Sequence, residues 1–126
     1  MAPLSRLVSD AELEILKALW EHGPGTVRDV QEHTSSPQAY TTTQTLLNRL
    51  RDKGFVDAEK DGRAFVFRAV VSRDQLLDQS LRTLADRVCE GASMPLLLNL
   101  LQSTRFSPDE LDRFRSLLDE LDQGGD

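Results

Sequence analysis

A polar stretch between residues 40 and 53 carries the side chains best suited to molecular recognition in this 126-residue chain. At 100° per residue, a helix over this stretch collects apolar side chains on one side and polar side chains on the other. Asn can hydrogen-bond adenine through two atoms, Arg can do the same with guanine, and Thr methyls contact thymine methyls. The polar side therefore fits the major groove of duplex DNA. It holds Thr41, Thr42, Thr45, Asn48 and Arg49, whereas Thr43, Leu46, Leu47 and Leu50 face the expected core.

Further polar side chains are expected to touch the phosphate backbone rather than the bases. Arg51 and Lys53 lie near the end of this helix, and Tyr40 lies at its start. Lys60 and Arg63 lie at a following turn. Thr26 caps the preceding helix, whose first amides can bind a phosphate. Plainer interpretations stay open: the threonines as caps facing solvent, the tyrosine as a lid over the core, and the turn residues as an ordinary solvated turn.

Three helices are expected to come first in the chain. Ser9 and Glu12 form a capping box, the pattern that starts a helix, and a Gly-Pro-Gly run at 23–25 stops it. Thr26 starts a second short helix. The third helix spans residues 40–53 and is closed by a glycine.

After the third helix, the hydrophobic period changes from helical to alternating. Lys60 begins a Lys-Asp-Gly run, the signal of a tight hairpin turn, and Phe65 and Phe67 share one face of the segment that follows. A two-stranded hairpin is marginal on its own, so we expect these two rings to pack in the core with Trp20. Three helices and a hairpin predict a winged helix-turn-helix domain over residues 1–71.

The second half, residues 72–126, is expected to hold three more helices and makes the chain mainly α-helical. Capping boxes mark helix starts at Ser72 and Ser107, and Pro95 fits the first turn of the helix between them. Leucine lies on nearly every side of that middle helix, and a helix that is apolar all round must be covered on all sides. We therefore predict that residues 72–126 form a dimerisation domain of an intertwined homodimer; burial of the middle helix against the first domain is the alternative. The expected interface residues are Leu77, Leu81, Leu84, Leu96, Leu97, Leu98, Leu100, Leu101, Leu111, Phe114 and Leu118.

Charge is divided unevenly along the chain. The net charge of −6 by itself argues against nucleic acid as a partner. Residues 72–126 contribute six basic and eleven acidic side chains, whereas residues 40–68 hold six basic and four acidic ones. Binding responds mainly to charge within roughly 8–10 Å, so this local excess is compatible with DNA. The acidic total favours the alternative function, a winged helix that serves protein–protein contact without specific DNA binding.

Several function classes find no support in the sequence. There is no Gly-rich phosphate loop, nucleophile elbow or metal-ligand cluster, so we expect neither an enzyme nor a cofactor or metal site. His22 and His33 lie on different segments, and Cys89, the only cysteine, fits a small buried helix position, with redox sensing as the alternative. No apolar run approaches the ~18 residues of a membrane span, and the first ten residues lack the apolar core of a signal peptide. A cytoplasmic protein without membrane insertion is expected.

Several short motifs occur together in a characteristic order and spacing. They are residues 13–30, Ala-Tyr-Thr-Thr at 39–42, 46–50 with the Lys-Gly pair at 53–54, Gly-Arg-Ala at 62–64, and Ser-Pro-Asp-Glu-Leu at 107–111. In combination these motifs make the chain resemble the BlaI/MecI penicillinase-repressor family over almost its whole length. The resemblance implies a small cytoplasmic dimer that represses transcription by binding palindromic operators, with an N-terminal winged helix for DNA and C-terminal helices for dimerisation.

Two branches of that family differ in how repression is relieved. The copper-responsive branch has a cysteine-rich C-terminal metal site, and the absence of cysteine after residue 89 argues against copper sensing by that site. In the penicillin-responsive branch, the repressor is cut after an Asn that precedes a Phe. Asn99 and Leu100 occupy the corresponding place, with Leu instead of Phe. The resemblance thus implies a candidate cleavage site there and, for part of the family, a membrane receptor-protease partner.

Overall fold

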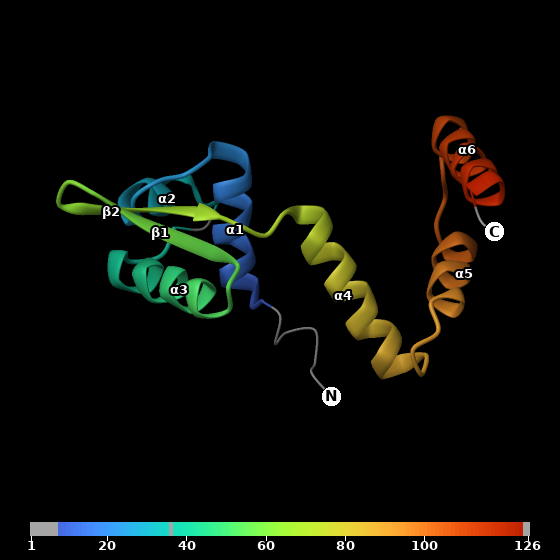
Figure 1. Cartoon of the computed structure of the whole chain (residues 1–126), viewed down its shortest axis with the longest axis horizontal. Coiled ribbons are helices and arrows are strands. Elements are labelled where there is room, and N and C mark those ends of the chain that lie inside the picture. The colour runs from blue at the N-terminus through green and yellow to red at the C-terminus, as the bar shows by residue number, and fades with distance from the viewer. Residues whose placement is uncertain (1–7, 36, 125–126) are drawn as a thin grey trace. The chain divides into compact units, whose positions relative to one another are not determined.

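The computed structural model describes residues 8–35 and 37–124, which fall into two compact units. The first unit ends at Gly91 and holds α1 (Asp10–His22), α2 (Val27–His33), α3 (Tyr40–Asp52), β1 (Val56–Asp61), β2 (Ala64–Ala69) and α4 (Arg73–Val88) (Figure 1). The second unit begins at Ala92 and holds α5 (Met94–Ser103) and α6 (Pro108–Gly124). The predicted fold class, mainly α-helical with a winged helix-turn-helix, is confirmed.

One aliphatic core holds the first unit together. Leu16 of α1 and Leu47 and Leu50 of α3 are fully buried at its centre. Val71, which follows the hairpin, and Leu76, in the first turn of α4, belong to the same cluster. The start of α4 therefore packs with the winged helix, whereas the sequence assigns this helix to the dimerisation domain. The functional boundary between residues 71 and 72 stays a prediction.

Four helices begin with the capping boxes that the sequence predicts. The hydroxyls of Ser9, Thr26 and Ser72 each accept a hydrogen bond from the third amide of the helix, whose third side chain accepts one from the cap amide. Ser107 forms the same pair of bonds at the start of α6. By contrast, α3 and α5 start without any side-chain cap.

The hairpin turn lies later than predicted. β1 and β2 pair antiparallel as far as Asp61 opposite Ala64, so the two turn residues are Gly62 and Arg63. Lys60, the first residue of the predicted turn, instead belongs to β1. Gly62 has a φ of 65°, which suits the first position of a tight hairpin turn and favours glycine there. The Asp-Gly pair is a correct turn signal, but only its glycine lies in the turn.

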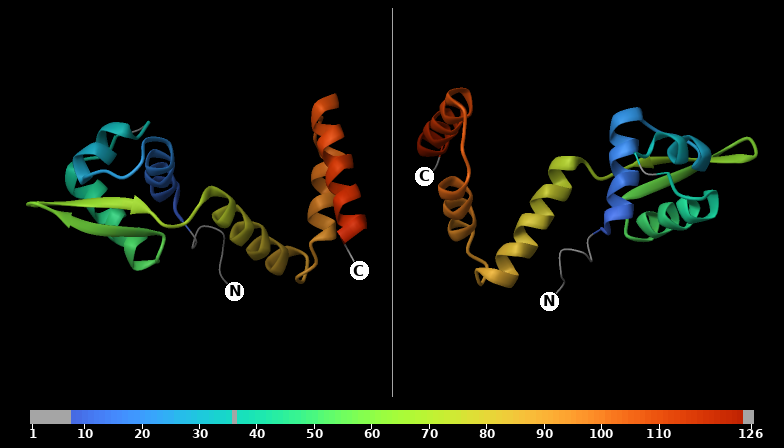
Figure 2. Two further views of the ribbon diagram at one scale, coloured as in Figure 1. Left: turned by 45° about the horizontal axis from the view of Figure 1, so that its top comes forward. Right: turned by 180° about the vertical axis from the view of Figure 1, so that it is seen from behind.

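The three aromatic residues that the sequence assigns to the core, Phe65, Phe67 and Trp20, differ in how deeply they are buried. Phe67 is 4% exposed, as predicted, whereas Phe65 is 49% exposed, so its assignment to the core is wrong. The hairpin extends beyond the helices, and its outer end has no helix to cover it (Figure 2). Trp20 is half-buried against the core, and its indole Nε1 donates to the carbonyl oxygen of Val71 over 2.9 Å.

Gly25 fastens the segment between α1 and α2 to the hairpin. Its amide donates to the carbonyl of Phe67 over 2.9 Å, and its carbonyl accepts from the Phe67 amide over 2.7 Å. A Cβ at position 25 would stand 2.9 Å from the Cβ of Asp29, the residue that closes the capping box of α2. This close approach explains a glycine at this position.

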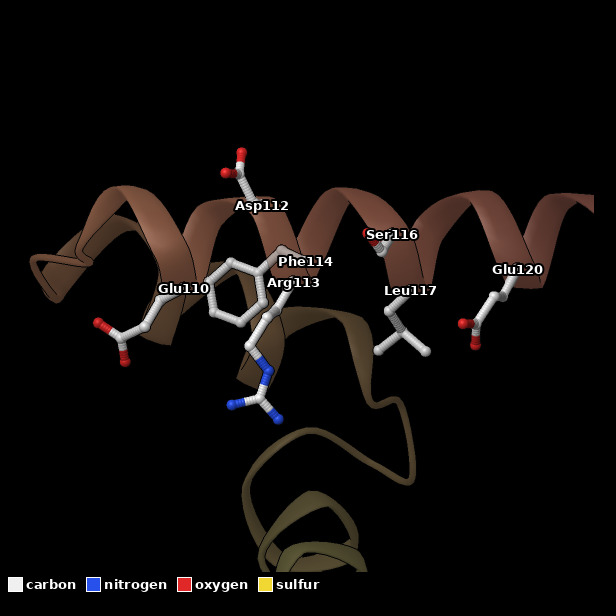
Figure 3. A pocket seen from close by; sticks show the side chains of 7 residues that line it. All are labelled: Glu110, Asp112, Arg113, Phe114, Ser116, Leu117 and Glu120. Atoms are coloured by element: carbon white, nitrogen blue, oxygen red, sulfur yellow. The ribbon is translucent and has the colours of Figure 1, made fainter.

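The second unit leaves most of its apolar surface open. No residue of α5 or α6 is buried, although Phe106 packs edge-on against Phe114 with ring centroids 4.9 Å apart. Along α6, Phe114 and Leu117 line a shallow hollow together with charged side chains (Figure 3). The exposed apolar residues of this unit are Met94, Leu97, Leu98, Leu100, Leu101, Leu111, Leu117, Leu118 and Leu121.

Cys89 is not a buried helix residue, which corrects the expectation from the sequence. It caps the C-terminal end of α4 and is half-buried. Its amide donates to the carbonyl of Ala85 over 2.8 Å. The chain then turns through Glu90 and Gly91, both with positive φ, so the helix ends at Val88, three residues before Gly91.

Candidate nucleic-acid interface

The two faces of α3 are divided as the sequence predicts. Thr43, Leu46, Leu47 and Leu50 are buried. The opposite side is open to solvent along the whole helix. It holds Thr41, Thr42, Thr45, Asn48 and Arg49, all exposed. This face therefore remains available for a partner, because none of its residues takes part in the core.

The first turn of α3 also leaves backbone groups available. Ala39 precedes the helix and offers no side chain to its first amides. Tyr40, the first helical residue, is 45% exposed and so does not form a lid over the core. The hydroxyl of Thr45 donates to the carbonyl of Thr41 over 2.9 Å, so its methyl group and both lone pairs of its oxygen are left for a partner.

The chain that leads into α3 is held by a side-chain bond. The amide nitrogen Nε2 of Gln31 in α2 donates to the carbonyl of Gln38 over 3.0 Å. The Thr43 amide, in the first turn of α3, donates to the carbonyl of Ala39 over 2.9 Å. The start of the exposed helix is thus tied to the helix that precedes it.

Cations with no carboxylate partner gather on α3 and the hairpin. Among the described residues, Arg49, Arg51, Lys60 and Arg63 are exposed and form no salt bridge. Other cations are paired: Arg82 with Asp78, Arg115 with Asp112 and, on β2, Arg68 with Asp57. Five more exposed arginines form no salt bridge among the described residues: Arg28, Arg73, Arg87, Arg105 and Arg113. A cation in a salt bridge attracts a phosphate less strongly, because the neighbouring carboxylate repels the phosphate. Arg49, Arg51, Lys60 and Arg63 are four of the cations that the sequence assigns to bases or phosphates.

Lys53 differs from the other predicted phosphate contacts. Its Nζ donates to Oε1 of Glu12 over 2.8 Å, and the Glu12 side chain is only 5% exposed. Lys53 therefore has a structural partner in the core-facing part of α1. The structure shows Lys53 in an ion pair with Glu12. A contact between Lys53 and a phosphate stays a prediction.

Thr26 is occupied as a helix cap. Its hydroxyl accepts from the Asp29 amide over 3.2 Å, and Oδ2 of Asp29 accepts from the Thr26 amide over 3.0 Å. These hydrogen bonds from Thr26 hold the pKa of the Asp29 carboxyl below its ordinary value. A carboxylate at the start of α2 repels a phosphate, so this helix start is a poorer anion site than the uncapped start of α3.

Sequence reasoning missed two exposed polar residues near this surface. Gln44 lies as far from the centre of the polar face of α3 as Arg49 does, and Gln can bond adenine through two atoms. The helical spacing that selected Arg49 selects it equally. Arg28 is exposed on α2 and forms no salt bridge among the described residues. It carries no motif and could not be found by spacing.

The two histidines come together although they lie on different helices. The rings of His22 and His33 are stacked, with centroids 3.9 Å apart and planes 19° from parallel. His22 Nε2 also lies 3.9 Å from a carboxylate oxygen of Glu21. Within residues 8–35 and 37–124, no group of three or more His, Cys, Asp or Glu side chains is arranged to hold a metal ion.

The start of α3 and the turn of the β1–β2 hairpin lie at the same end of the first unit (Figures 1 and 2). Figures 1 and 2 show that the N-terminal end of α3 and the turn between β1 and β2 point in the same direction. A helix with an open polar face beside a projecting hairpin whose outer end carries exposed Lys60 and Arg63 is the arrangement of a winged helix that reads DNA. The fold and this surface define a winged-helix transcription regulator.

Comparison with known proteins identifies the family. The model of the penicillinase repressor family matches residues 8–120. The transcriptional regulator BlaI of Mycobacterium tuberculosis is 36% identical over 128 residues, covering 98% of this chain and 91% of the relative. The penicillinase repressor of Bacillus licheniformis is 29% identical over 115 residues, covering 90% of each chain. The chain belongs to the penicillinase repressor family, as the resemblance in its sequence predicts.

Solved structures agree on the fold. The regulator BpsR of Bordetella bronchiseptica superposes with a TM-score of 0.52, covering 96% of this chain and 83% of that one. At 17% sequence identity, this likeness concerns the fold alone. In the part of the chain that is described, no helix is both long and apolar enough to cross a membrane.

Proposed function

We propose that this chain is a dimeric transcriptional repressor that binds palindromic operator DNA. In this proposal α3 enters the major groove of one half-site, and the β1–β2 hairpin holds the flanking backbone. The observation that carries it is the exposed polar face of α3, whose Arg49, like Arg51 near it, forms no salt bridge with any described residue. Two relatives that match the chain over most of its length, one named a penicillinase repressor and the other a transcriptional regulator, support the same proposal.

A homodimer is proposed because many large apolar side chains of α4 and α5 are exposed in the part of the chain that the structure describes. Leu77 and Leu81 of α4 are 54% and 41% exposed, and the leucines of α5 are mostly exposed as well. Exposed apolar side chains gathered along a helix mark a site of association. Two-fold symmetry in the protein then requires a palindromic operator, with half-sites roughly 10 bp or 20 bp apart from centre to centre.

Release of the operator is proposed to involve the C-terminal helices. Asn99 and Leu100 lie inside α5, and the Ser103 hydroxyl donates to the Asn99 carbonyl over 2.7 Å. A protease needs an extended segment, so cleavage at this bond requires α5 to unfold locally. The helix has no side-chain cap at its start and no residue buried within the chain, both of which lower the cost of opening. Proteolysis at this bond is the candidate signal.

Fluorescence anisotropy with a palindromic duplex from the chain's own upstream region tests the proposal. Titrations at two salt concentrations, against a scrambled duplex of equal length, separate specific from electrostatic binding. We expect one dimer per palindrome, a steep salt dependence and a large loss of affinity on scrambling. Equal affinity for both duplexes would contradict a sequence-specific repressor.

The acidic net charge of −6 favours a second candidate, a winged helix that binds protein rather than DNA. That function predicts no salt-dependent binding to either duplex. The same titration therefore decides between the two candidates, and absence of binding at low salt would favour the protein partner.

A further inference from the structure

The two faces of the β1–β2 hairpin carry different side chains. Residues directly opposite each other in an antiparallel pair lie on the same face. Ala58 pairs with Phe67, whose ring is buried in the core, so this pair defines the inner face. Lys60 pairs with Phe65, two positions further along each strand, and therefore lies on the inner face as well.

All acidic residues of the two strands lie on the other face. Asp57, Glu59 and Asp61 alternate with the inner-face residues of β1. On that outer face, Arg68 pairs with Asp57 over 3.3 Å. The inner face of the two strands is thus free of carboxylates, although β1 has three acidic residues and one basic residue.

The outer end of the inner face is uncovered. The Phe65 ring is 49% exposed, and Lys60 beside it is exposed without a salt bridge among the described residues. Leaving half an aromatic ring in water forgoes hydrophobic stabilisation that burial would supply. A ring next to an unpaired ammonium matches the chemistry of a nucleic-acid backbone, in which apolar sugar carbons alternate with phosphates.

We propose that Phe65 and Lys60 form a docking patch for the backbone of duplex DNA. The Phe65 ring packs against deoxyribose carbons at the edge of the minor groove, and the Lys60 ammonium neutralises the neighbouring phosphate. This inference rests on the proposed function, and it adds an apolar contact to a hairpin that charge alone would assign to phosphates. The carboxylates on the outer face then point away from the DNA.

Duplex DNA is favoured over a protein as the occupant for two reasons. The turn beside the patch carries Arg63, also exposed and without a salt bridge among the described residues. The hairpin turn also points the same way as the N-terminal end of α3, the helix proposed to enter the major groove (Figures 1 and 2). A duplex held by α3 brings its flanking backbone to this end of the hairpin.

The first test uses the full-length chain and the variant Phe65→Ala, with Val66→Ala on the outer face as its control. We expect Phe65→Ala to weaken binding about 5-fold or more on both the palindromic and the scrambled duplex, because a sugar contact carries no sequence information. The salt dependence should not change. Phe65→Leu, which keeps an apolar side chain, should retain most of the affinity, and Val66→Ala should bind within about twofold of the wild type.

The second test compares two neighbours on opposite faces, Lys60→Gln and Glu59→Gln. Lys60→Gln should lower the salt slope by about one counterion, whereas Glu59→Gln should leave the slope unchanged. Urea unfolding of each variant separates a loss of contact from a loss of fold. Wild-type affinity in the Phe65→Ala variant, while the wild type binds its operator, would overturn the patch alone. Absence of binding by the wild-type chain would overturn the proposed function as well.

Discussion

The ammonium of Lys53 and the carboxylate of Glu12 join the end of α3 to the first turn of α1, with Nζ and Oε1 2.8 Å apart. The same Oε1 accepts the Ser9 amide over 2.8 Å, so one oxygen serves both the capping box and the ion pair. Oε2 is buried without a hydrogen-bond partner among the described residues. The pair fixes where α3 ends relative to α1, and thereby helps to orient the polar face of α3.

Loss of the Lys53 ammonium should destabilise the first unit. Lys53→Met leaves the buried Glu12 carboxylate without its cation, and we expect the free energy of unfolding in urea to fall by about 1–3 kcal/mol. The control is Lys17→Met, because Lys17 lies 3.7 Å from Glu14 and their side chains are 52% and 35% exposed, far more than the Glu12 side chain. That surface pair should contribute no more than about 0.5 kcal/mol. Equal effects of the two substitutions would contradict a structural role for Lys53.

The free energy of unfolding should also fall in acid, because the Glu12 carboxylate becomes protonated. Burial by itself raises the pKa of Glu12, but hydrogen bonds from Lys53 and Ser9 outweigh it, and the pKa lies below the ordinary value of 4.5. The ionised Glu12 therefore stabilises the folded state above pH 4.5, and this contribution is lost as the pH falls through the lower pKa of the folded chain.

The Glu12→Gln variant isolates that contribution. Its free energy of unfolding should lie below that of the wild type near neutral pH, and the difference should shrink below pH 4.5. Thermal or urea unfolding at a series of pH values measures it. A difference that stays constant down to the acid limit would mean that the charge of Glu12 contributes nothing.

The polar face of α3 should carry sequence specificity. Asn48→Ala and Arg49→Ala are each expected to weaken operator binding by about 1–3 kcal/mol and to leave binding to scrambled DNA almost unchanged. Anisotropy titrations measure both affinities. Arg87→Ala, an exposed arginine near the end of α4, is the control and should change neither. An equal loss on both duplexes would assign Asn48 and Arg49 to phosphates instead of bases.

A charge on α5 should separate the proposed dimer. Leu97 and Leu101 are 50% and 39% exposed, four residues apart and hence on one side of the helix. Leu97→Glu or Leu101→Glu should shift the chain to monomers in analytical ultracentrifugation and weaken operator binding. Gln102→Glu adds the same charge at a polar position and is expected to remain dimeric. Sedimentation of both leucine variants as dimers would remove α5 from the interface.

Local signals in the sequence predict the elements well. Capping boxes at Ser9, Thr26, Ser72 and Ser107 place four helix starts, because each box is made by residues three positions apart. The helical period separates buried Leu47 from exposed Asn48, since the direction of a side chain on a helix follows from its position alone. The face of α3 and the family could therefore be found without coordinates.

Contacts between distant residues could be decided only by the tertiary structure. Alternation places Phe65 and Phe67 on one face, but only the reach of the helices decides that Phe67 is buried and Phe65 is exposed. No local rule brings His22 onto His33 or separates Lys53, bound to Glu12, from the unpaired Arg51. The sequence by itself determined which residues can recognise a partner. The tertiary structure decided which of these residues stay exposed, because burial and pairing depend on neighbours that folding brings together from far along the sequence.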